Sequence, residues 1–94
     1  MYNLPVEYSS LGPYEKRPVR EQYVKKQKGL CYFCKESLEG PARQDVRRAK
    51  INESLFPRNF FSHPIHLHHD HNTDLTLGAV HSRCNAYLWQ YLGE

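Results

Sequence analysis

Hydrophobic positions recur with helical spacing in three stretches of the chain and with strand spacing in two. The first helix is predicted over residues 18–28, where Val19, Tyr23 and Val24 form an apolar stripe. A proline suits its first position, and Gly29 provides a stop signal.

The next stretch, residues 40–51, predicts a short helix that starts at Pro41. Its apolar residues fall on one face at spacings i, i+4 and i+7, and they are Ala42, Val46 and Ala49. Residues 52–64 combine turn formers with aromatic residues and predict a loop. The side chains expected to pack this loop are Leu55, Phe56, Phe60 and Phe61.

The C-terminal third predicts a β-hairpin that leads into a helix. Residues 65–69 alternate between apolar and polar, and residues 75–80 follow as a second strand after a turn at 72–74. Ser82 is a good N-cap for a last helix, which we expect to run to about Leu92. The predicted fold class is therefore α+β.

Composition adds a reason to expect a stabilising cross-link. The chain has 94 residues, of which 39% are hydrophobic, so its core is thin and a domain of this size usually needs disulfides or a metal. Three cysteines cannot all pair within one chain, which favours a metal. We expect an irregular tail over residues 1–13 and one domain over 14–94. With neither a secretory signal nor an apolar run of about 20 residues, we expect a cytoplasmic protein with no membrane association.

The formal charge of +3 is modest, but basic residues cluster. Residues 15–28 carry six basic and two acidic side chains, and residues 43–50 carry four basic and one acidic. Such stretches bind phosphates without reading bases, or they are simply solvated helix faces. The candidates for DNA contacts are Arg20, Lys25 and Lys28.

Two short spacings predict a structural zinc site. Cys31-x-x-Cys34 is one half of a zinc knuckle, and His81-x-x-Cys84 supplies a second half. Three thiolates and one imidazole make a closed tetrahedral set. His63 or His66 could compete for the fourth position, and in the alternative without metal the cysteines are small buried hydrophobic residues.

The segment 66–74, HLHHDHNTD, places four histidines within six residues. The zinc ligands are assigned elsewhere, which leaves these histidines for another role. From residue 65 the predicted elements are strand, turn, strand and helix. The first strand carries the pair His68 and His69, and Asn85 follows the last cysteine. The quoted pieces LHHDHNTD, LGAVHSRCN and CYFC resemble the HNH, or ββα-metal, endonuclease family, and within it the phage recombination endonuclease VII-like group. The resemblance covers residues 31–34 and 65–89, and residues 37–63 form an insertion.

The resemblance implies a small zinc-stapled treble-clef domain that hydrolyses DNA, double-stranded by expectation, leaving a 5′-phosphate and a 3′-hydroxyl. By position, His69 is the general base, while His68 and Asn85 hold a catalytic divalent metal (Mg²⁺, Mn²⁺, Ni²⁺ or Zn²⁺). In the endonuclease VII-like group the residue that corresponds to His68 is an aspartate. With histidine there, we expect the preferred divalent metal to be a softer ion.

Several alternatives remain open at this point. Asp70 and His71 could form the catalytic pair in a register shifted by two, and otherwise Asp70, His71 and Asn72 support the site or contact phosphate. Neighbouring residues on a strand point to opposite faces, so His68 and His69 need a bend or bulge to serve one site. The aromatic residues of the last helix, Trp89 among them, are expected in the core and cap rather than on a base-stacking surface. A non-catalytic treble-clef module that binds nucleic acid or protein is the competing function.

Overall fold

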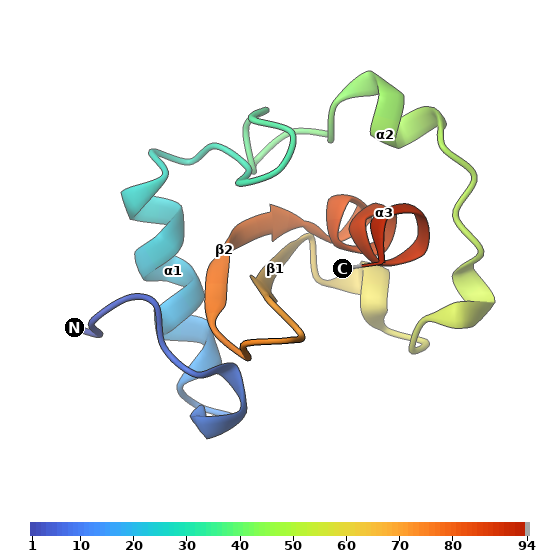
Figure 1. Cartoon of the computed structure of the whole chain (residues 1–94). Helices are drawn as coiled ribbons and strands as arrows, with labels where there is room; N and C mark the ends of the chain where they lie inside the picture. Colours follow the sequence, from blue (N-terminus) through green and yellow to red (C-terminus); the bar gives the residue numbers. More distant parts are fainter. Residues whose placement is uncertain (94) are drawn as a thin grey trace.

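A two-stranded antiparallel sheet lies between two helices in the computed structural model, which describes residues 1–93 (Figure 1). The fold is α+β, as predicted. In chain order the elements are the 3-10 turn η1 (Tyr8–Ser10), α1 (Lys16–Lys26), α2 (Gln44–Arg48), the 3-10 turns η2 (Glu53–Leu55) and η3 (Phe60–Ser62), β1 (Ile65–His69), β2 (Thr76–His81) and α3 (Ser82–Leu92).

Helix α1 packs its predicted apolar stripe against the start of β2. Val19 and Tyr23 are buried, and the Tyr23 hydroxyl lies 2.7 Å from the Thr76 hydroxyl. The helix begins at Lys16, two residues earlier than predicted. It also ends two residues earlier, because the backbone turns left-handed at Lys28 (φ 57°) and Gly29 (φ 77°). This αL turn directs the chain away from the helix and into the Cys31–Cys34 segment.

The pairing of the hairpin is irregular at the end of β1. Cα partners run from Ile65 opposite His81 to His68 opposite Gly78, and then His69 pairs with Thr76. The register therefore shifts between His68 and His69, which is a β-bulge.

Strand β2 continues into α3 without a loop. The N-cap position is His81, so the prediction of Ser82 as N-cap was wrong by one residue, and the cap makes no side-chain hydrogen bond. At the other end Gly93, with φ 71°, terminates α3 in the left-handed conformation that glycine adopts at little cost.

The insertion at 37–63 is less regular than predicted. Helix α2 starts at Gln44 rather than at Pro41, although Ala42 and Val46 are buried as expected. In the predicted loop at 52–64, η2 and η3 form, and Leu55 is 50% exposed instead of packing the loop.

Arg83 ties this insertion to α3. Its guanidinium donates hydrogen bonds to the carbonyl oxygens of Val46 (3.3 Å), Arg47 (3.1 Å) and Ala49 (2.8 Å) at the end of α2. An arginine at this place satisfies carbonyls that a helix end leaves without intrahelical partners.

The N-terminal segment, expected as an irregular tail, packs on the hairpin. Val6 and Thr76 exchange hydrogen bonds, and the Tyr8 amide donates to the Asp74 carbonyl at 2.7 Å. The sequence did not predict this docking, which brings Tyr8 to the end of β1.

The buried core is small, and the three cysteines belong to it. Its members are Val19, Tyr23, Cys31, Cys34, Leu38, Ala42, Val46, Ala79, Val80 and Cys84. Across residues 1–93, the helices are too short or too polar for any of them to span a membrane.

Candidate functional site

The Cys31–Cys34 knuckle is held against β2 by a close backbone approach. The Tyr32 amide donates to the Ala79 carbonyl at 2.9 Å, and the Gln27 side chain bonds both the amide and the carbonyl of Ala79. A Cβ at Gly78 would lie 2.9 Å from the Cβ of Tyr32 and 2.7 Å from Oε1 of Gln27. Glycine at position 78 therefore lets the knuckle approach the strand.

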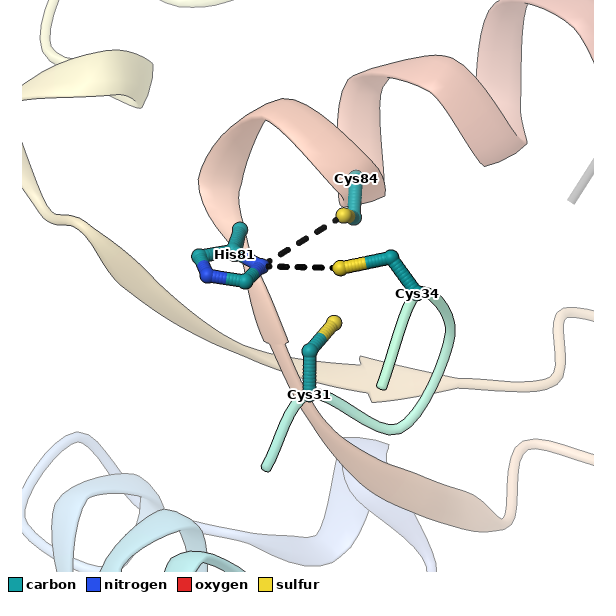
Figure 2. Close-up of side chains that lie close together, drawn as sticks. All are labelled: Cys31, Cys34, His81 and Cys84. Atoms are coloured by element: carbon teal, nitrogen blue, oxygen red, sulfur yellow. Dashed lines mark hydrogen bonds between the residues drawn. The ribbon is translucent and has the colours of Figure 1, made fainter. Parts of the chain in front are cut away.

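Four side chains from this knuckle and from the β2–α3 junction converge in the core. The ligand atoms of Cys31, Cys34, His81 and Cys84 all lie within 4.8 Å of one another, and all four residues are buried. Figure 2 shows the two knuckle cysteines facing His81, at the end of β2, and Cys84, in the first turn of α3. The predicted set of four is confirmed as a cluster that could hold zinc.

The hydrogen bonds of His81 prepare its ring for a metal. Nε2 lies 2.8 Å from the Ser37 carbonyl, which requires that this nitrogen carry the proton. Nδ1 therefore presents its lone pair to the sulfur atoms of Cys34 (3.5 Å) and Cys84 (3.6 Å). A carbonyl partner on the far nitrogen is typical of metal-ligating histidines.

One thiol of the cluster, that of Cys31, loses its proton readily. The Cys84 thiol donates a hydrogen bond that lowers the pKa of Cys31 to about 4, and the amides of Cys34, His81 and Phe33 also lower it. The same hydrogen bond, together with burial, raises the pKa of Cys84. One thiolate is thus favoured before any metal binds, and Zn²⁺ would displace the remaining protons. The donor set of three sulfurs and one imidazole fits Zn²⁺.

A second group of polar side chains lines an open cavity beside β1. His68, His69, His71 and Asn85 contribute to a cavity of about 290 Å³, which we call the histidine cavity. His68 and His69 both line it although they are neighbours in β1, and the register shift of the hairpin, which leaves Leu77 of β2 unpaired, lies beside them. In residues 1–93 these histidines form no second cluster of three metal-ligating side chains like the Cys₃His group.

His69 is held by aromatic contacts. Its ring stacks on Tyr8 with centroids 3.8 Å apart and an interplanar angle of 7°, and the His71 ring lies 4.8 Å away. Partial burial, followed by the nearby His71, lowers the pKa of His69, so its imidazole is neutral at neutral pH. His68 is 2% exposed, and its ring centroid lies 6.3 Å from that of Tyr32.

Asn85 is fixed by His66, a contact that the sequence did not predict. The Asn85 amide nitrogen lies 3.1 Å from Nδ1 of His66, whose Nε2 lies 2.8 Å from the Phe60 carbonyl. Burial lowers the pKa of His66 and keeps its ring neutral, so Nδ1 accepts and Nε2 donates. These bonds commit His66 to Asn85 rather than to the zinc cluster. Because the amide nitrogen of Asn85 faces His66, its amide oxygen is the atom that could bind a metal.

Asp70 organises the hairpin turn. One carboxylate oxygen accepts hydrogen bonds from the amides of Asn72 (2.7 Å) and Thr73 (3.1 Å), and these bonds lower the pKa of Asp70. The carboxylate thus has a structural role in the turn. Asn72 is an exposed residue of the same turn.

The predicted DNA-contacting residues lie in different surroundings. Arg20 lines a second cavity together with Lys16, His66 and Asn85, and this cavity, which we call the basic cavity, adjoins the histidine cavity. Lys25 lines a different pocket, with Met1 at the N-terminus, and Lys28 is an exposed residue beyond the end of α1. Of the three, the structure brings Arg20 to the candidate site.

Comparison with known proteins returned no match among family models, curated proteins or solved structures.

Proposed function

We propose that the protein is an HNH-type, or ββα-metal, endonuclease that hydrolyses phosphodiester bonds in DNA, with a treble-clef zinc site as its scaffold. One observation carries the proposal. A bulged hairpin and the helix that follows it bring His68, His69 and Asn85 to one open cavity, while the adjacent residue Cys84 faces the buried cluster. Side chains on a helix turn about 100° per residue, so one helical turn serves both sites.

His69 is the general base in this proposal. Its neutral imidazole accepts a proton from the attacking water, and the Tyr8 stack limits rotation of the ring. General-base catalysis of this kind contributes roughly 10²–10⁴ in rate.

His68 and Asn85 are the proposed ligands of a catalytic divalent metal. Such an ion supplies Lewis-acid stabilisation of charge on the phosphate and the leaving oxygen. One imidazole and one amide oxygen suit Mn²⁺, Ni²⁺ or Zn²⁺ better than Mg²⁺, which prefers oxygen ligands. His66 holds the Asn85 amide in one orientation through the 3.1 Å hydrogen bond.

Nicking of supercoiled plasmid tests the proposal. The zinc-loaded protein is incubated with plasmid in separate reactions containing Mg²⁺, Mn²⁺, Ni²⁺ or additional Zn²⁺, and we expect nicked circles with at least one of them. If the parent and the His69→Ala variant are equally inert with every metal, the endonuclease proposal is wrong. In that case a non-catalytic treble-clef module takes its place.

A further inference from the structure

The histidine cavity has two chemically different walls. His68, His69 and Asn85 form a polar wall, and Phe56 and Trp89 contribute to an apolar one. Trp89 is 46% exposed, and its ring lies 5.5 Å from that of Phe56 at an interplanar angle of 71°. The expectation that Trp89 lies in the core was therefore wrong, because the residue is exposed.

The basic cavity adjoins the histidine cavity. The lining that the two share includes Tyr8 and Asn85, and the basic cavity adds Lys16 and Arg20. Lys16 also lies over the Tyr8 ring, with its ammonium 4.6 Å from the ring centroid. The surface thus passes from cationic groups, through imidazoles and an amide, to aromatic rings.

A nucleotide has the complementary arrangement, with an anionic phosphate at one end and a flat aromatic base at the other. A cavity of about 290 Å³ lies at the small end of ligand pockets, which begin near roughly 300 Å³, and suits one base better than several. The base of an intact duplex is stacked on both faces, so it must leave the helix before an aromatic side chain can cover it.

We propose that these adjoining cavities bind one unpaired nucleotide of DNA, with its base against Trp89 and Phe56 and its phosphate between Asn85 and His69. The strand continues along Lys16 and Arg20. The position of the phosphate rests on the proposed endonuclease function, whereas the aromatic base site does not. The preferred substrate class is then single-stranded or locally unpaired DNA.

Trp89 is the only tryptophan of the chain, so its fluorescence reports directly on the base site. The zinc-loaded protein is titrated, without added catalytic metal and at one fixed salt concentration, with a short single-stranded oligonucleotide and with the duplex of the same sequence. We expect the single strand to quench Trp89 and to bind several-fold more tightly than the duplex.

Substitutions in α3 distinguish a loss of base stacking on Trp89 from a general loss of stability of the fold. Loss of one base–aromatic stack in Trp89→Ala should weaken single-strand binding about 5- to 150-fold, measured by anisotropy of a labelled oligonucleotide. Trp89→Phe keeps a ring and should retain most of the affinity. The matched control is Tyr91→Ala, which removes a 49% exposed aromatic residue of the same helix that lies outside both cavities, and binding should be unchanged.

Equal or tighter binding of the duplex, or unchanged single-strand binding by Trp89→Ala, would overturn the inference. If the protein nicks plasmid under those outcomes, the endonuclease proposal stands and only the base site is wrong. Quenching by single strands without cleavage by any metal supports the base site and removes the endonuclease proposal.

Discussion

Two histidine side chains, His81 and His69, lie in contrasting regions of this molecule. In the Cys₃His cluster, His81 is 5% exposed, one ring nitrogen is bonded to the Ser37 carbonyl, and the other faces two sulfur atoms. In the histidine cavity, His69 is half-buried, is held by a stacked tyrosine and borders open space. The cluster is closed, as structural zinc sites are, and the cavity leaves room for a substrate.

This difference suggests that the cluster and the cavity have separate roles, one in stability and one in chemistry. The cluster joins the knuckle to the β2–α3 junction in a core that is otherwise small, so it stabilises the fold. The cavity is built on the same junction and depends on it for the position of Asn85. The contrast predicts that changes in the cluster abolish the fold, and that changes in the cavity leave the fold intact and affect chemistry.

Removal of zinc should have the largest effect. Structural zinc in small domains contributes an apparent ~10–16 kcal/mol near pH 7, compared with about 5–15 kcal/mol for the net stability of a typical domain. We expect one zinc per chain by metal analysis, and unfolding by circular dichroism after strong chelation or in Cys34→Ser. His63→Ala, which changes an exposed histidine outside the cluster, should retain the metal. A fold that survives complete removal of metal would contradict the structural role of the cluster.

Substitutions in the cavity should come next. His69→Ala should lose roughly 10²–10⁴ in nicking rate, without rescue by metal, because the base is missing. His68→Ala and Asn85→Ala should lose activity that a higher metal concentration partly restores. All three variants should keep one zinc per chain, since none changes a ligand of the cluster.

A different pattern of activity among the histidine variants would identify the other catalytic pair. If His69→Ala nicks plasmid at nearly the parent rate and His71→Ala is inactive, the catalytic pair is Asp70 and His71. The turn-forming hydrogen bonds of Asp70 would then be secondary to its chemistry.

Gly78→Ala tests the contact that docks the knuckle on β2. The added methyl group has no space beside Tyr32 and Gln27, and overpacking of this kind costs about 1–3 kcal/mol. We expect a lower midpoint in urea denaturation of the zinc-loaded protein. Gly40→Ala is the matched control, because its nearest contact would be an ordinary 3.9 Å, and similar losses in both variants would show that the close approach is unimportant.

The salt dependence of DNA binding should separate Arg20 from Lys25. Each phosphate contact contributes about 0.9 to the log–log slope for duplex DNA, or about 0.7 for a single strand. Arg20→Ala should reduce the slope by about that amount, whereas Lys25→Ala, on a different pocket, should leave it unchanged. Equal slopes for both variants and the parent would place the DNA path elsewhere.

The smallest effect concerns the pH dependence of cleavage. Burial holds the pKa of His69 below its ordinary value of about 6.5, so the base stays neutral until the pH falls below that value. Tyr8→Ala exposes the ring and should raise this pKa, which moves the acid limb of the pH–rate profile to higher pH. Tyr8→Phe keeps the stack and should follow the parent, and histidine NMR titration gives the pKa directly.

Local patterns were sufficient for much of the fold and for the metal cluster. The helical spacing of Val19 and Tyr23, the alternation in β1 and the cysteine spacings depend on neighbours within a few residues, so the sequence alone predicts them. The boundaries were less accurate, as at Pro41, because capping and packing decide where a helix begins.

The sequence alone also left open which of three histidines completes the cluster that could hold zinc. The tertiary structure distinguishes them through hydrogen bonds between distant segments, from His81 to Ser37 and from His66 to Asn85. No local pattern encodes such partners, because they lie on segments that meet only after folding.

The surroundings of the cavity were likewise decided by tertiary structure. Tyr8 comes from a segment that looked like a tail, and Trp89 from a helix whose aromatic residues were expected in the core, yet both border the histidines. The sequence by itself determined which side chains can bind metal and accept protons. Which of them share a cavity depended on contacts across some 60 residues of chain, as between Tyr8 and His69, and periodicity carries no information at that distance.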